Sequence, residues 1–165
     1  MTHKDRAEAV SPSASAFFFT NHTHSMSRAA FDIAVHELGT AEIYGDDHND
    51  RIIEYHQTTS LKATSDEVPW CASFVNWCLK KAVCHGTNSA RARSFLAWGK
   101  EISLEEARRG DIVMLSRGTN PAFGHVGFFA GREQDSVLLL GGNQSNKVSI
   151  SPYPTHRIIS IRRAI

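Results

Sequence analysis

Residues 69–82 read PWCASFVNWCLKKA, and this segment carries the strongest structural signal in the chain. Its apolar side chains recur at the i, i+3, i+4, i+7, i+8 and i+11 spacing of one helical face: Cys71, Phe74, Val75, Cys78, Leu79 and Ala82. Pro69 suits the first turn of such a helix, and Gly86 suits its end. We therefore predict a buried helix that begins close to Cys71.

The first half of the chain contains three further helical patterns. We predict a helix from an N-cap at Ser27 to a terminating Gly39, with apolar positions at Phe31, Ala34, Val35 and Leu38. A short helix is predicted around residues 52–56, and another over residues 90–98, closed by Gly99.

The second half contains short runs rich in Val, Ile, Leu and Phe, separated by Gly, Pro, Asn and Asp. These runs predict strands at residues 112–115, 125–130, 136–140, 147–150 and 157–163. Helices followed by strands indicate an α+β domain in which N-terminal helices pack on a C-terminal antiparallel sheet.

Length and composition exclude several classes of protein. The chain has 165 residues, is 41% hydrophobic and carries a formal charge of +1, which fits one folded domain and gives no reason to expect nucleic-acid binding. Its longest apolar run is far shorter than the roughly 20 residues needed to span a bilayer, so we expect no membrane association. Three cysteines close together do not suggest a disulfide framework, and we expect Cys78 and Cys84 to be structural thiols.

Residues 1–27 lack helical or strand periodicity and are rich in Ser, Thr, His and Ala. We expect them to form a flexible arm in front of a single domain spanning residues 28–165. The apolar cluster at residues 16–19 is shorter than the core of a signal peptide, which predicts synthesis in the cytoplasm without a secretion signal.

Cys71 is the candidate nucleophile. A thiol at a helix N-terminus has a lowered pKa, because unpaired N–H groups and the helix dipole favour the thiolate. The alternative is that Cys71 is a small core residue on the apolar stripe.

His125 is the candidate base, since it opens a predicted strand next to Gly127. If the following turn centres near Glu133, antiparallel pairing places His125 opposite Gly141. Asn143 is then a diagonal neighbour whose amide oxygen could orient the imidazole, as the third member of a triad does. The alternative is that Asn143 is merely a loop residue.

Four motifs occur in order along the chain, and together they resemble the cysteine peptidoglycan hydrolases of the NlpC and CHAP type. They are PWCASFVNW at 69–77, GDIV at 110–113, GHVGF at 124–128 and GGNQ at 141–144. The resemblance extends from about Phe31 to Arg163, and is strongest to a compact branch found in phage lysins and secreted cell-wall effectors.

The resemblance implies a papain-like fold with Cys71 as nucleophile, His125 as base and Asn143 as the orienting residue. Two departures are the order Ala72-Ser73 after the cysteine, where relatives often have Ser then Ala, and Tyr44 in place of a common proline.

Several other polar and aromatic residues are candidates for the site. Trp70, Gln144 and Arg117 are predicted to bind substrate, although packing, bracing of the loop and exposure to solvent are the respective alternatives. Asp111 is predicted to be a structural turn residue. The sequence His36-Glu37 begins like a zinc motif, but Thr40 occupies the place of its second histidine, so we expect no metal site and no cofactor.

The predicted function is hydrolysis of an amide bond in cell-wall peptide by a Cys-His-Asn thiol mechanism, as an amidase or an endopeptidase. Two alternatives are a papain-like acyltransferase or peptidase acting on another substrate, and an inactive binding module of the same fold.

The predicted partner is peptidoglycan, with an immunity or delivery protein as a further partner, and the protein is expected to be a monomer. Because no secretion signal is predicted, we expect action in the periplasm or cell wall after delivery by a secretion system or a phage holin. The protein would act there as a phage lysin or a secreted antibacterial effector.

Overall fold

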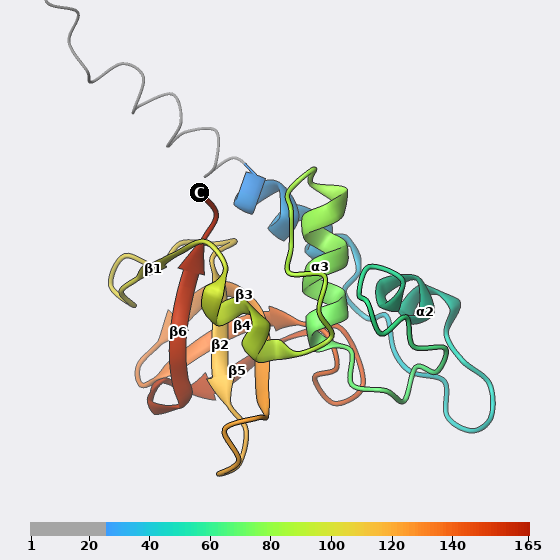
Figure 1. Ribbon diagram of the computed structural model, residues 1–165. Coiled ribbons are helices and arrows are strands. Elements are labelled where there is room, and N and C mark those ends of the chain that lie inside the picture. Colours follow the sequence, from blue (N-terminus) through green and yellow to red (C-terminus); the bar gives the residue numbers. More distant parts are fainter. Residues whose placement is uncertain (1–25) are drawn as a thin grey trace, which may run out of the picture.

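The computed structural model describes residues 26–165 (Figure 1). The predicted arm therefore lies outside the described residues, apart from positions 26 and 27. Both of these already belong to a helix that runs to residue 36, so the prediction of Ser27 as N-cap is wrong. This helix buries Phe31 and Ala34 as expected, and Gly39 follows it with a φ of +92°.

Two α-helices and a 3-10 helix follow. Helix α2 spans Asp50–His56, and its N-cap Asn49 accepts a hydrogen bond from the Arg51 N–H group. Helix α3 spans Cys71–Lys81 and buries every residue from Cys71 to Leu79. The helix predicted over residues 90–98 is a 3-10 helix, Ala92–Ala97.

Helix α3 ends earlier than Gly86, the residue that was predicted to end it. Its C-cap is Ala82, and Val83 turns the chain with a φ of +57°. A β-branched residue rarely adopts this conformation, so the sequence contained no signal for it. Gly86 instead packs against α3, where an added Cβ would lie 2.1 Å from the Asn76 side-chain oxygen.

The second half forms one antiparallel sheet of six strands in the order β1-β6-β2-β3-β4-β5. The strands are β1 (Lys100–Ile102), β2 (Ile112–Ser116), β3 (Gly124–Glu133), β4 (Ser136–Gly141), β5 (Ser149–Pro154) and β6 (Ile158–Arg163). The sequence did not predict β1, and it placed β5 at residues 147–150. Pro152 and Pro154 concealed the true strand, which is tolerated because β5 lies at an edge of the sheet.

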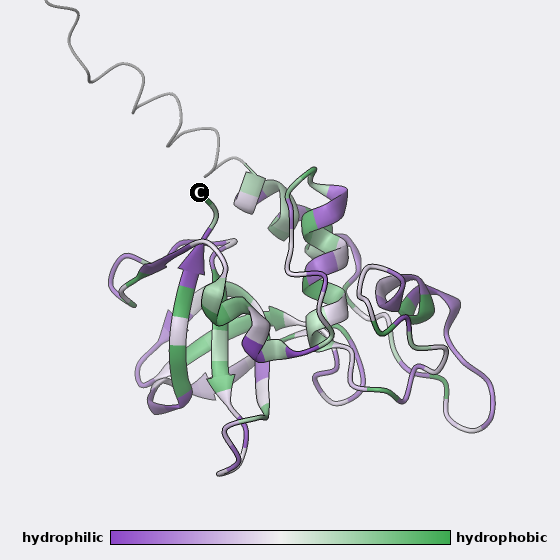
Figure 2. Ribbon diagram, viewed as in Figure 1, coloured by the Kyte–Doolittle hydropathy of each residue, from purple (hydrophilic) through white to green (hydrophobic). Residues whose placement is uncertain are grey.

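Helix α3 and the 3-10 helix lie against one face of the sheet, α2 packs on α3, and the main core forms between these helices and the sheet (Figures 1 and 2). Aromatic side chains of the helical half dominate this core: Tyr55, Trp70, Phe74 and Phe95 are fully buried. A smaller apolar cluster that includes Val113, Leu139 and Ile161 covers the other face. This arrangement confirms the predicted α+β class. Between residues 26 and 165, no helix is both long and apolar enough to cross a membrane.

A buried ion pair connects the start of β2 to the end of β6. Asp111 has a side chain only 1% exposed, and it accepts hydrogen bonds from Arg163 Nε at 2.8 Å and Nη2 at 2.7 Å. It also accepts a bond from the Arg108 N–H group at 2.7 Å. Asp111 is therefore the structural residue that the sequence predicted.

We predict that Asp111→Ala lowers the free energy of unfolding by about 3 kcal/mol, because it removes the buried carboxylate and leaves the largely covered Arg163 guanidinium without its charged partner. The matched control is Asp32→Ala, which removes an exposed ion pair with Arg28 and should change stability little. Urea unfolding of both variants would measure the difference. Equal stabilities would contradict a structural role for the buried pair.

Candidate active site

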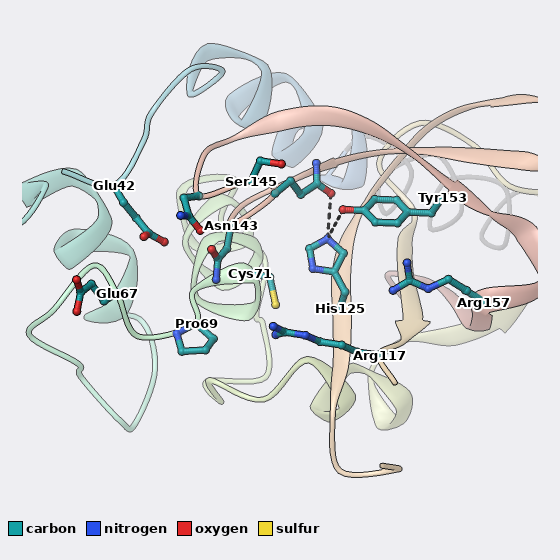
Figure 3. A pocket seen from close by; sticks show the side chains of 12 residues that line it. Glu42, Glu67, Pro69, Cys71, Arg117, His125, Asn143, Ser145, Tyr153 and Arg157 are labelled. Atoms are coloured by element: carbon teal, nitrogen blue, oxygen red, sulfur yellow. Dashed lines mark hydrogen bonds between the residues drawn. The ribbon is translucent and has the colours of Figure 1, made fainter. Parts of the chain in front are cut away.

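A cleft of about 390 Å³ opens at the N-terminal end of α3 (Figure 3). Polar and charged side chains from both halves of the chain line it: Glu42, Glu67, Arg117, His125, Asn143, Gln144, Ser145, Asn146, Tyr153 and Arg157, together with Pro69 and Cys71. Cys71 and His125 lie next to each other in the middle of this lining.

Cys71 is the first residue of α3, where backbone N–H groups have no partner within the helix. Burial raises the pKa of the Cys71 thiol, but the neighbouring His125 imidazole and the amides of Val126 and Ala72 outweigh this effect. The net pKa lies below the ordinary value of a cysteine. Cys71 belongs to the main core and is 8% exposed, and it also lines the cleft.

His125 projects from the first residues of β3 and pairs across the sheet with Leu115 of β2. Its Nε2 atom lies 2.9 Å from the side-chain oxygen of Gln144, and its other ring nitrogen is on the side of Cys71 (Figure 3). Burial lowers the pKa of His125, but the adjacent Cys71 thiolate and the hydrogen bond to Gln144 more than compensate, so the pKa is raised. The opposite shifts of the two groups favour a thiolate–imidazolium pair.

Gln144 is the residue that orients His125. Its amide nitrogen donates hydrogen bonds to the carbonyl oxygens of Ser149 at 2.7 Å and Leu139 at 3.2 Å. The amide oxygen is therefore directed at the imidazole, which must donate from Nε2 and keep its other nitrogen for Cys71. Gln144 is 4% exposed, and it braces the site rather than presenting a surface to substrate.

The prediction that Asn143 orients the imidazole is wrong, because the strand register differs from the expected one. The β3–β4 turn lies at Gln134 and Asp135, and the pairing shifts between Phe129 and Gly131. As a result, Gly127 rather than His125 lies against Gly141: a Cβ on Gly127 would sit 3.5 Å from the Gly141 Cα. Asn143 follows with a φ of +56° and lines the cleft.

Two glycines allow this loop to approach the site closely. A Cβ on Gly141 would lie 2.7 Å from the Gln144 side-chain oxygen. A Cβ on Gly142 would lie 2.6 Å from the Trp70 ring and 2.8 Å from the Phe74 Cβ. Side chains at these positions would displace Gln144 or α3.

Tyr153 and Arg157 also line the site, although the sequence did not indicate them. The Tyr153 hydroxyl lies 3.5 Å from His125 Nε2, its ring centre lies 5.4 Å from the imidazole, and the Arg157 guanidinium covers the tyrosine ring at 5.3 Å. Together they cover one side of the imidazole (Figure 3). Only the correct position of β5 would have shown that Tyr153 faces the site.

Of the residues predicted to bind substrate, Trp70 is buried in the core and Arg117 lines the cleft. Trp70 is fully buried and its Nε1 atom donates to Glu42 at 2.8 Å, so the prediction that it contacts substrate is wrong. Arg117 is exposed and lines the cleft beside Cys71 (Figure 3).

The remaining thiols differ from Cys71 in their electrostatic surroundings. All three cysteines are free. Burial raises the pKa of Cys78 well above its ordinary value and also raises the pKa of Cys84. Within residues 26–165, no cluster of three or more His, Cys, Asp or Glu side chains could hold a metal ion.

Part of the chain, including both reacting residues, is similar to a known protein family. Residues 63–143, which include both Cys71 and His125, match the CHAP domain. No curated protein sequence matches the chain significantly.

Solved structures of NlpC/P60 proteins share the fold. An NLP/P60 family lipoprotein-like protein from Staphylococcus aureus is 19% identical with a TM-score of 0.53, over 85% of this chain and 41% of that chain. The peptidoglycan hydrolase RipB from Mycobacterium tuberculosis is 16% identical with a TM-score of 0.54, over 95% and 73% of the two chains. RipD from the same organism, described as a non-catalytic NlpC/p60 protein adapted to peptidoglycan binding, is 14% identical with a TM-score of 0.52, over 85% and 98%.

This chain spans less than half the length of the staphylococcal protein. At these identities the structural likeness shows the fold, which is the predicted papain-like arrangement of helices on an antiparallel sheet. The CHAP match over residues 63–143 and this shared fold are consistent with a member of the CHAP/NlpC papain-like superfamily.

Proposed function

We propose that the protein is a peptidoglycan hydrolase that cleaves an amide bond of the wall peptide with the Cys71 thiolate. The observation that carries this proposal is that Cys71, at the start of α3, lies next to His125 in an open cleft, and the opposed pKa shifts of the two groups agree with this geometry. Such a pair is typical of an activated thiol nucleophile. The description of RipB as a peptidoglycan hydrolase supports the choice of substrate.

The geometry supports a two-step thiol mechanism. The Cys71 sulfur attacks the amide carbonyl, and the negative charge on the tetrahedral oxygen is stabilised by N–H groups at the start of α3. His125 gives its proton to the leaving amine as the C–N bond breaks, which leaves a thioester on Cys71. His125 then takes a proton from water, whose oxygen attacks the thioester and releases the acid and the thiol.

Gln144 acts in this mechanism as a positioning residue. Its bond to Nε2 holds the ring so that the other nitrogen faces Cys71, and it stabilises the imidazolium that forms beside the thiolate. The proposed unit is therefore Cys71, His125 and Gln144.

The cleaved bond is either the sugar–peptide amide or a link between amino acids. Mass spectrometry of the fragments released from purified peptidoglycan would identify it. The likeness to RipD raises a non-catalytic binding role as the competing function. The lowered pKa of Cys71 favours hydrolysis, since a binding module needs no activated thiol.

We predict that Cys71→Ala abolishes hydrolysis of purified peptidoglycan while leaving the melting temperature nearly unchanged, because the reacting atom is lost but a small apolar side chain remains. The matched control is Cys78→Ala, which should retain turnover and lose about 1 kcal/mol or more of stability because the thiol is fully buried. Iodoacetamide should label Cys71 first. Full activity of Cys71→Ala would exclude the thiol mechanism.

We predict that Gln144→Ala shifts the alkaline limb of the pH–rate profile to lower pH. This limb reports deprotonation of His125, and the hydrogen bond that the imidazole donates to Gln144 raises the pKa of that group. The neighbouring change Asn143→Ala removes a residue of the same loop without touching the imidazole, and it should leave the limb in place. Turnover should also fall more in Gln144→Ala, by about 10-fold or more.

The opposite pattern, a shifted limb in Asn143→Ala and none in Gln144→Ala, would restore Asn143 as the orienting residue. Thermal melts of both variants would separate loss of folded protein from loss of the proton-transfer geometry.

We further propose that the protein acts as an antibacterial agent on the outer side of the cytoplasmic membrane, where peptidoglycan lies. Expression in the cytoplasm of a Gram-negative host should be harmless, whereas the same chain fused to a periplasmic export signal should cause rounding and lysis. Lysis should require both Cys71 and His125. Toxicity of the Cys71→Ala form, or equal toxicity from both compartments, would indicate a different target.

A further inference from the structure

The cleft at Cys71 does not end at the reacting pair. A second hollow of about 850 Å³ continues from it, and the two share Pro69, Cys71 and Arg117 as lining residues. A substrate held at Cys71 can therefore extend in two directions, one toward Glu42 and Glu67 and the other into this second hollow.

An anchored carboxylate lines the first direction. Glu42 is half-buried, and one of its oxygens accepts a hydrogen bond at 2.8 Å from Nε1 of Trp70, which is itself fully buried. This contact fixes the carboxylate on the wall of the cleft. Glu67 lies beside it on the same side of Cys71 (Figure 3). Neither acid forms an ion pair with any other residue of the segment 26–165.

An anchored cation lines the second direction. Arg93 is half-buried, and its Nε atom donates to the Phe123 carbonyl oxygen at 2.7 Å, which leaves the terminal nitrogens of the guanidinium without a recorded hydrogen bond among the described residues. Arg91 and Arg117 line the same hollow, and its lining includes no acidic residue. Across the part of the chain that the structure describes, these three arginines also have no acidic partner.

Much of the remaining lining of the second hollow is apolar. Pro121, Ala122 and Phe123 form one side, and Phe123 remains 59% exposed. An aliphatic chain could lie against these side chains while its carboxylate reaches the arginines.

From these two walls we infer that the substrate amide lies between an ammonium group and a carboxylate. The ammonium binds on the side of Glu42 and Glu67, and the carboxylate binds on the side of Arg93, Arg91 and Arg117. Hydrolysis thus yields one product that carries the ammonium and another that carries the carboxylate. This inference rests on the proposed function, since it assigns the polarity of the peptide that the hydrolase accepts.

The reason is electrostatic. A charge fixed on a cleft wall and left without a partner attracts an opposite charge more strongly than a mobile surface charge does, because part of its desolvation and ordering has already occurred on folding. Both walls hold such a charge, negative toward Glu42 and Glu67 and positive in the second hollow.

The test uses four peptidoglycan-derived peptide fragments that differ only in charge. The amine is free or acetylated, and the carboxylate is free or amidated. For the wild-type chain we expect acetylation and amidation each to lower kcat/KM about 10-fold or more, with the doubly blocked fragment the poorest substrate.

Single substitutions test which residues cause the preference for the free amine and which cause the preference for the free carboxylate. Glu42→Gln keeps an oxygen for the Trp70 bond and removes only the charge, so the ratio between free and acetylated amine should fall toward one while the carboxylate ratio persists. Arg93→Gln should bring the ratio between free and amidated carboxylate toward one while the amine ratio persists. The matched controls are Glu105→Gln and Arg132→Gln, which neutralise exposed charges outside both hollows and should leave both ratios unchanged.

The outcomes separate this inference from the proposed function. If the wild-type chain cleaves all four fragments equally well, the proposed hydrolase function is supported and the charge assignment is overturned. If it cleaves none, calorimetric binding of the same four fragments to the full-length chain decides the inference: tighter binding of the doubly charged fragment supports it, and equal binding overturns it.

Discussion

The close contact between the start of α3 and the loop that follows β4 is the constraint on which the site depends. Gly142 lies so near the Trp70 ring and the Phe74 Cβ that even a methyl group would not fit. This contact sets the separation of the helical half from the sheet at the position where Cys71 faces His125. The residues that react therefore need no long connections of their own, because core packing already brings them together.

The preceding residue, Gly141, helps to explain why Gln144 can orient the imidazole. Gly141 leaves room for the glutamine side chain to fold back over the strand end, and the carbonyls of Leu139 and Ser149 fix its amide nitrogen. One face of the imidazole is then covered by Tyr153. A thiolate and an imidazolium can coexist in this setting because each is the other's main stabilising charge, and burial alone would favour the neutral forms of both.

Regular periodicity predicted the parts of the fold that matter most to the nucleophile. The apolar spacing of residues 71–82 located α3 and placed Cys71 at its first residue, and the run at 125–130 located the strand that carries His125. The orienting role of Gln144 could not be predicted, because the position of the β3–β4 turn and the register shift near Ala130 leave no clear trace in residue type. The position of strand β5 was also not predicted, because it contains Pro152 and Pro154 and proline normally indicates that a strand is absent.

The difference in pKa between Cys71 and the other two thiols determines which cysteine an oxidant would modify first. Oxidants and disulfide reagents react with thiolates, and the shifted pKa values leave Cys71 as the readily ionised cysteine while Cys78 and Cys84 stay protonated. Oxidation would therefore inactivate Cys71 before it modified the buried thiols Cys78 and Cys84. A protein oxidised only at Cys71 keeps its fold. A reductant that reaches the open cleft can then restore activity, provided that the sulfur is oxidised only to a sulfenic acid or a mixed disulfide.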